Sequence, residues 1–152
     1  MVKCGLLKAR DESSILSKRT KYMKIGFTGS REGMSPLQIQ HLVLLLCELK
    51  PSEFHHGDCK GADEEAHKIV EEFFPECRIV VHPPESDYLR AFCAAHEYKE
   101  PLGYVARDRK IVEDTVYLIG APLTDVEQVR SGSWTTIRHA RKLSRPLIVL
   151  QR

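Results

Sequence analysis

Short apolar runs alternate along this chain with longer segments that carry apolar residues at helical spacing. The runs are mostly continuous rather than alternating with polar residues, which is typical of parallel strands covered by helices on both faces. We therefore predict a single α/β domain, with a mostly parallel sheet of about five strands or more and helices on both faces. The expected strands are Lys24–Thr28, Glu53–His56, Arg78–His82, Thr115–Ile119 and Pro146–Leu150.

Helix-end signals fall between these runs. Ser35 followed by Pro36 is a typical helix start, and Pro51 follows the end of the same apolar pattern. The segment 85–103 shows no regular pattern apart from a short helix expected near 88–95. Further helices are expected at 62–74, 105–113 and 133–143.

The first residues differ in charge from the rest of the chain. Residues 1–23 carry six Lys or Arg and two acidic residues, which leaves 17 basic and 19 acidic residues of the totals of 23 and 21. We predict a basic, flexible extension at 1–22 and a folded domain at 23–152. The slightly acidic domain gives no support to duplex-DNA binding, which uses a concentrated basic face.

Two classes of protein are disfavoured by composition. No apolar run reaches the roughly 20 residues that cross a bilayer, so we expect no membrane partner. The five cysteines are odd in number, widely spaced and form no CxxC pair, which favours a reducing, cytoplasmic compartment.

A metal site is one hypothesis for the residues around the second strand, which are His55, His56, Asp58, Cys59 and His67. Neighbouring residues of a strand point to opposite faces, so His55 and His56 do not easily share one ion. No HExxH or paired-cysteine spacing is present either. We expect no metal and no required cofactor.

Small, polar or kinked segments follow four of the five expected strands. The carboxyl ends of parallel strands meet at one edge of the sheet, where ligands bind. Glycines, hydroxyl groups, arginines and helix N-termini suit a phosphate. The candidate ligand-binding residues are Thr28, Gly29, Ser30, Arg31, Gly57, Gly61, Ala62, His82, Arg107, Arg109, Ser131, Gly132, Ser133, Trp134, Thr135 and Thr136.

Each of these residues also has a purely structural interpretation. Asp58 is expected either to contact a ribose hydroxyl or to orient a neighbouring residue, whereas the structural interpretation makes Asp58 and Asp63 turn and cap residues. Arg107 and Arg109 belong either to a solvated helix face or to the ligand edge, and Trp134 either stacks on a base or fills the core. No G-x-S-x-G elbow supports a Ser-His-Asp hydrolase.

The ordered motifs GFTGSR, HHGDCKGAD, VHPP, YVARDRKIV, TVYLIGAP and SGSWTTIRHARK resemble the SLOG superfamily. These Rossmann-like domains include the LOG-type nucleotide phosphoribohydrolases and the DprA/Smf recombination mediators. The resemblance is strongest to small stand-alone, YspA-like proteins of bacteria and phages, and it covers residues 24–150. It implies a Rossmann-like domain with a pocket for a nucleotide-derived ligand, and pairing through helices in the superfamily's enzymes suggests a homodimer.

One departure from the family concerns catalysis. The phosphoribohydrolases carry PGGxGTxxE, whereas this chain has SGSWTTIRH, with His139 in place of the glutamate. The candidate catalytic residues are Asp58, Asp63 and His139, and whether the chain is an enzyme stays open.

Three functions follow, in order of preference. The first is a nucleotide-binding module or sensor, with the nucleotide as its ligand. The second is an N-glycosidase that hydrolyses a nucleotide and releases free base. The third, by analogy with the recombination mediators, is single-stranded DNA binding, which the acidic domain does not favour.

Overall fold

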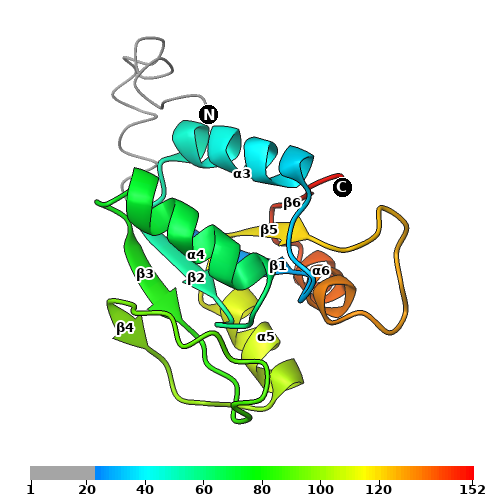
Figure 1. Ribbon diagram of the computed structural model, residues 1–152. Coiled ribbons are helices and arrows are strands. Elements are labelled where there is room, and N and C mark those ends of the chain that lie inside the picture. The colour runs from blue at the N-terminus through cyan, green and yellow to red at the C-terminus, as the bar shows by residue number, and fades with distance from the viewer. Residues whose placement is uncertain (1–22) are drawn as a thin grey trace.

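The strands of this protein form one parallel sheet, because a helix or a long loop returns the chain after every strand. The computed structural model describes residues 23–152 (Figure 1), so the extension expected at 1–22 lies outside the described residues. The strand order is β4-β3-β2-β1-β5-β6. The strands are β1 Lys24–Gly29, β2 Glu53–His56, β3 Arg78–Val81, β4 Glu97–Tyr98, β5 Tyr117–Ala121 and β6 Leu147–Val149.

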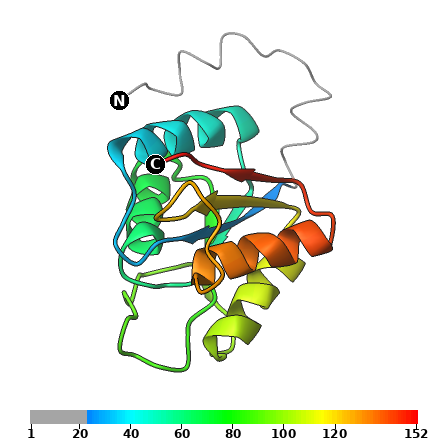
Figure 2. The ribbon, with the colours of Figure 1, turned by 90° about the vertical axis from the view of Figure 1, so that its right-hand side faces the viewer.

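Four helices in the described part of the chain cover the two faces of the sheet. They are α3 Pro36–Leu49, α4 Ala62–Phe73, α5 Tyr104–Glu113 and α6 Gly132–Lys142. Helices α3 and α4 lie on one face, and α5 and α6 lie on the other (Figure 1 and Figure 2). This arrangement confirms the predicted α/β domain.

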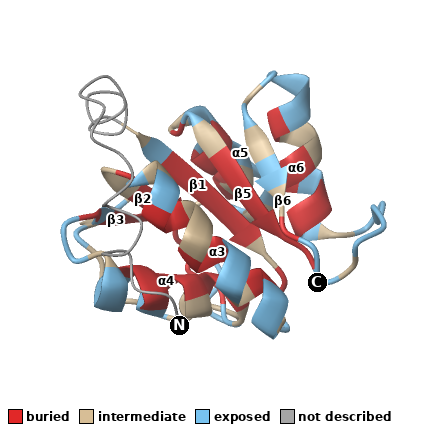
Figure 3. Ribbon diagram, turned by 90° about the horizontal axis from the view of Figure 1, so that it is seen from above, coloured by how far each residue is buried: buried red, intermediate tan, exposed pale blue. Residues whose placement is uncertain are grey.

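Side chains alternate between two cores across the sheet. Ile25 and Phe27 of β1 pack in the larger cluster, with apolar residues of α3 and α4. Leu118 of β5 packs in the smaller one, with Trp134 and Ile137 of α6. The central strands β1 and β5 are therefore buried on both faces (Figure 3), as their continuous apolar runs predict.

The start of α3 has the expected cap. The Ser35 hydroxyl accepts a hydrogen bond from the Gln38 N–H at 3.1 Å, and the Gln38 side chain accepts one from the Ser35 N–H at 3.0 Å. The buried Gln38 amide also donates to the carbonyls of Pro122 and Leu150, at 2.9 and 3.2 Å. One side chain thus caps the helix and ties it to the segments after β5 and β6.

Two expectations about local structure were wrong. The segment 88–95 is irregular rather than helical, and it leads into the two-residue strand β4, which the sequence did not indicate. Backbone and side-chain bonds to Asp58 hold this segment, so distant contacts outweigh its local helical preference. Strand β5 begins and ends two residues later than expected, and Thr115 lies before it, with its hydroxyl donating to the Ile111 carbonyl of α5.

The chain reverses its direction of travel across the sheet beside β1. It passes outward through β2, β3 and β4, and then returns to the other side of β1 to form β5 and β6. This topological switch point opens a crevice at the carboxyl ends of β1 and β5, where doubly wound domains bind ligands. No helix within residues 23–152 is both long and apolar enough to span a bilayer.

Candidate functional site

A small inner cavity of about 70 Å³ lies where the ends of β1 and β2 meet α4, α5 and the start of α6. Eight of its lining residues were expected at the site: Asp63 as a candidate catalytic residue, and Thr28, Gly29, Arg31, Gly57, Arg107, Gly132 and Ser133 as candidate ligand-binding residues. Five are not: Phe27, Cys59, Tyr104, Asp108 and Ile111. The structure therefore brings four separate segments of the sequence to one place.

A larger pocket of about 540 Å³ adjoins this cavity. The two share Gly29, Arg31, Gly132 and Ser133, so they form one continuous crevice. The outer pocket also includes Ser30 and Ser131 with part of the loop between β5 and α6. Its volume lies within the range of small-molecule sites, about 300–1,000 Å³.

The start of α6 presents backbone donors to the crevice. The Ser131 hydroxyl accepts a hydrogen bond from the Trp134 N–H at 3.3 Å, and the Ser131 carbonyl accepts one from the Thr135 N–H at 2.8 Å. The N–H groups of Gly132 and Ser133 donate to no residue in the described part of the chain. Free N–H groups at a helix N-terminus favour an anion.

Gly61 and Ala62 pack against the residues at the end of β1 and support the crevice without lining it. A Cβ on Gly29 would lie 2.4 Å from the Ala62 Cβ, which is too close. Strand β1 and helix α4 can therefore pack in contact only because position 29 has no side chain. The Ala62 N–H donates to the Ser30 carbonyl at 2.9 Å. Gly61 adopts φ +95°, a backbone conformation that favours glycine. Neither Gly61 nor Ala62 lines the inner cavity or the outer pocket.

Arg107 is the buried cation of the site, with 5% of its surface exposed. Its Nη1 donates to the Gly57 carbonyl and, at 3.4 Å, to the His82 carbonyl. Its Nε lies 2.6 Å from Asp108 Oδ1 in an ion pair that lacks hydrogen-bond alignment. A Cβ on Gly57 would lie 2.4 Å from Nη1, which explains the glycine. The solvated-face interpretation thus fails for Arg107 and fits the exposed Arg109.

Tyr104 lies between two guanidinium groups. The Arg31 Cζ is 5.2 Å from the centre of the ring, and the Arg107 Cζ is 5.6 Å from it. Tyr104, Arg107 and Asp108 have the i, i+3, i+4 spacing of one helix face. That spacing, rather than the arginines alone, is the signal that could have identified Tyr104 and Asp108.

Asp63 is the cavity's least satisfied acid. It is 6% exposed, and its Oδ2 accepts a hydrogen bond from the Cys59 N–H at 3.2 Å, whereas Oδ1 has no partner. Burial raises the pKa of this carboxyl to about 7. Arg107 and the N–H groups of Cys59 and Gly57 lower the same pKa, but their effect is smaller. The Gly57 N–H is near enough to affect the pKa but makes no hydrogen bond of normal geometry. The pKa of the Cys59 thiol is also raised, mainly by burial and to a smaller extent by the nearby charge of Asp63.

Asp58 lies outside the cavity. It is fully buried, and its two oxygens bind Arg90 Nε at 2.8 Å and the Cys93 N–H at 2.9 Å. Its backbone adopts φ +57°, a left-handed conformation that Asp tolerates. In this structure Asp58 therefore anchors the irregular segment that carries Arg90 and Cys93.

The remaining predicted residues are dispersed. His139 lines a separate groove of about 200 Å³ between α5 and α6, with Arg109, Thr135 and Thr136. The Trp134 side chain is in the core. His82 pairs with His55 instead of facing the crevice, with 2.8 Å between Nε2 and Nδ1.

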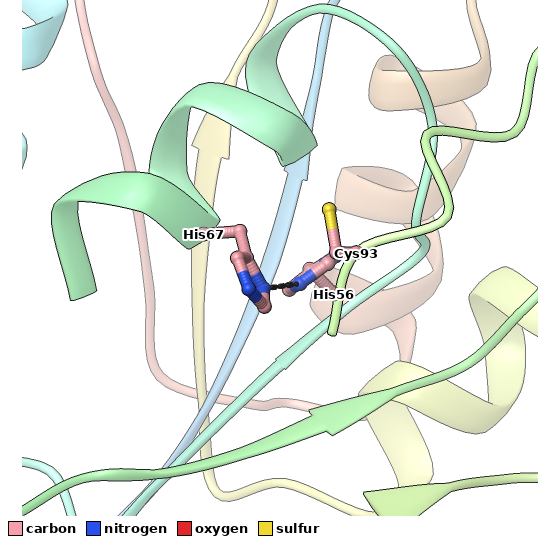
Figure 4. Close-up of side chains that lie close together, drawn as sticks. All are labelled: His56, His67 and Cys93. Atoms are coloured by element: carbon pink, nitrogen blue, oxygen red, sulfur yellow. Dashed lines mark hydrogen bonds between the residues drawn. The ribbon is translucent and has the colours of Figure 1, made fainter. Parts of the chain in front are cut away.

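A second histidine pair lies beside a cysteine. His56 Nε2 is 2.9 Å from His67 Nδ1, and the sulfur of Cys93 lies near both rings (Figure 4). His56 Nδ1 accepts a hydrogen bond from the Asp58 N–H at 3.0 Å, so in the neutral ring Nε2 carries the proton and donates it to His67. A metal would need the lone pairs that these bonds use. The pattern therefore favours a hydrogen-bonded pair over an ion, and the absence of a metal stays a prediction.

Comparison with known proteins places the fold but not a family. No known protein-family profile matches the sequence, and no curated protein matches it. The molybdenum cofactor binding protein from the phototrophic bacterium Rippkaea orientalis is similar in structure, with a TM-score of 0.66 and 18% identity over 86% of this chain and 77% of that one. The structural-genomics target TM1055 has a TM-score of 0.58 and 16% identity, over 82% of this chain and 72% of that one.

DNA processing protein A (DprA) from Streptococcus pneumoniae is also similar, with a TM-score of 0.60 and 22% identity over 87% of this chain. This chain spans about half of that protein, 51% of its length. These similarities agree with a Rossmann-like fold. At such identities they establish the fold alone, and the YspA-like assignment stays a prediction.

Proposed function

We propose that this chain is a ligand-binding module, and that it binds a phosphorylated, nucleotide-derived molecule in the crevice at the switch point. The observation that carries the proposal is the pair of free N–H groups at Gly132 and Ser133, which lie in the same crevice as Arg31. A helix N-terminus, an exposed guanidinium and glycine-rich strand ends together suit a phosphate.

The size of the crevice supports a small molecule. The outer pocket of about 540 Å³ holds a nucleotide-sized ligand, whereas the inner cavity of about 70 Å³ accepts only a small group. Of the similar structures, one is named for binding the molybdenum cofactor and one for DNA processing. Fold analogy does not separate these ligand classes, so the proposal depends on the crevice.

A thermal-shift screen of the full chain tests the proposal, with nucleoside monophosphates, NAD, ADP-ribose and short single-stranded DNA as probes. A ligand at about 100 times its Kd adds about 2.7 kcal/mol to the unfolding free energy, which raises Tm. We expect one nucleotide to raise Tm, and Arg31→Ala and Gly132→Asp each to abolish the rise.

The controls separate local effects from changes in folding. Gly132→Ala adds a methyl group where a Cβ meets nothing within 4 Å, so it should keep the shift. Lys60→Ala removes an exposed cation that lines neither the inner cavity nor the outer pocket, and should also keep it. A shift with DNA alone would favour the DNA-binding alternative, and no shift with any probe would refute nucleotide binding.

The second candidate function is N-glycosidic hydrolysis of the bound nucleotide. It is favoured by Asp63, a buried carboxyl in the cavity whose pKa is raised to about 7, where a carboxyl group exchanges protons readily. Incubation with the nucleotide that binds should then release free base, and Asp63→Asn should stop the release. Binding without free base would leave the ligand-binding module as the function.

A further inference from the structure

The inner cavity contains a buried polar atom that the protein leaves without a hydrogen bond. Asp63 Oδ1 is that atom, in a residue that is 6% exposed at the start of α4. The other oxygen, Oδ2, is fixed by the Cys59 N–H, so the carboxyl group is held in one orientation. An unpaired buried carboxyl oxygen is unfavourable, and a ligand atom that fills the cavity and bonds to it would relieve that penalty.

The charges around the cavity restrict the group that fits beside Asp63. The cavity is lined by two acids, Asp63 and Asp108, and by two arginines, Arg31 and Arg107. The Arg107 charge is already paired with Asp108, with 2.6 Å between Nε and Oδ1. A phosphate beside Asp63 would meet a carboxyl group, and an ammonium group would meet two guanidinium groups. A neutral polar group avoids both repulsions.

A hydroxyl is the neutral group that matches Asp63 in either protonation state. It donates to Oδ1 when the carboxyl is ionised and accepts from it when the carboxyl is protonated. This matters because burial raises the pKa of Asp63 to about 7, where both states are present. The cavity of about 70 Å³ is too small for a base or a sugar ring but admits the hydroxyl edge of a sugar.

We propose that Asp63 binds a ribose hydroxyl of the ligand, so that the crevice selects ribose over 2-deoxyribose. The inference rests on the proposed function, because the phosphate lies at the start of α6 and beside Arg31, in the outer part of the same crevice. Asp63 is then the residue that determines which sugar is accepted. This role differs from that of Asp58, whose two oxygens are occupied by Arg90 and Cys93.

Isothermal titration calorimetry on the full chain tests this selection with three probes: inorganic phosphate, ribose 5-phosphate and 2-deoxyribose 5-phosphate. One hydrogen bond to a buried ionisable group should make ribose 5-phosphate bind about 10- to 100-fold more tightly than its 2-deoxy analogue. Asp63→Ala should reduce that ratio to about 1 while phosphate binding persists. Glu64→Ala, which removes an acid from the same helical turn but outside the cavity, should keep the ratio.

The outcomes separate this inference from the proposed function. Equal binding of the two sugars by the wild type, with Arg31→Ala still abolishing phosphate binding, overturns the role of Asp63 alone. No binding of any phosphate probe overturns the proposed function and the inference together. If Asp63→Ala does not fold, Asp63→Leu keeps a branched side chain of similar shape without a polar atom, so its ratio should also fall to about 1. An unchanged ratio in that variant contradicts the inference.

Discussion

At the scale of single residues, the loop after β2 and the start of α4 each contain a buried acid, and the two acids have opposite situations. Both oxygens of Asp58 are bound by groups from the segment around 90–93, whereas one oxygen of Asp63 has no partner. The sequence places Asp58 in the loop between Gly57 and Gly61 and Asp63 at the start of the next helix, and it shows no difference in how the two side chains are satisfied. Their difference depends on Arg90 and Cys93, which no local pattern relates to Asp58.

The glycines of the crevice give a prediction about stability. Gly61→Ala should lower the unfolding free energy by about 1–3 kcal/mol, because Gly61 has φ +95° and a Cβ would lie 2.3 Å from the Arg31 carbonyl oxygen. The same substitution at Gly132 should change it by less than about 1 kcal/mol, in the stabilising direction. Urea unfolding of the two variants measures the difference, and equal effects would contradict it.

At the scale of elements, the strands were predictable because burial on both faces requires apolar runs. Strand β2 has the predicted bounds, and β1, β3 and β6 differ from the predicted bounds by one residue at one or both ends. Strand β4 was not predictable, because two residues carry no pattern of their own, and the contacts that hold them, such as the pairing with β3, come from distant parts of the chain. Of the candidate site, the sequence indicated the strand ends and Arg107 but not its partner Asp108 or Tyr104.

Asp58 provides the prediction at this scale. Asp58→Ala leaves the Arg90 guanidinium and the Cys93 N–H without their acceptor, and should cost about 2–3 kcal/mol. The freed segment should become sensitive to trypsin at Arg90, as limited proteolysis would show.

Two variants check that the effect comes from this buried carboxylate. Asp58→Asn keeps an oxygen and tolerates the left-handed backbone, so it should cost less. Asp87→Ala removes the exposed partner of Arg90, at 4.0 Å, and should change little. Resistance of Asp58→Ala to trypsin would show that the segment is held by other contacts.

At the scale of the whole molecule, two neighbouring histidines of β2 point to opposite sides of the strand. His55 pairs with His82, and His56 pairs with His67. Burial lowers the pKa of His55 and His56, and it lowers the pKa of His82 to about 3. The folded protein therefore depends on histidines that remain neutral.

This dependence predicts a loss of stability in acid. Below about pH 6.5 the unfolded chain takes up protons on His55, His56 and His82 that the folded chain does not accept. The unfolding free energy therefore decreases as the pH is lowered. Each histidine contributes up to about 1.4 kcal/mol per pH unit, down to its own folded pKa, about 3 for His82. Asp63 acts in the opposite direction between about pH 7 and 4, because its folded pKa is raised.

Denaturant unfolding at pH 7.5, 6.5 and 5.5 measures the slope. The three histidines outweigh the raised carboxyl pKa values of Asp63 and Asp108, so stability should fall across this range. Asp63→Asn removes one opposing contribution and should steepen the fall. A flat profile for both the wild type and Asp63→Asn would show that the histidines take up protons equally in both states.

The position of β1 in the middle of the sheet also bears on how the chain reaches this fold. On one side Ile25 pairs with Phe54, which follows it closely in the sequence. On the other side it pairs with Tyr117, which comes much later in the sequence. During synthesis one edge of β1 therefore stays unpaired until most of the described chain has left the ribosome. Such non-local parallel pairing gives a high contact order and slow folding. A chain truncated before β5 would also lack Gly132 and Ser133 of α6, so it should lose the proposed phosphate contacts of the crevice.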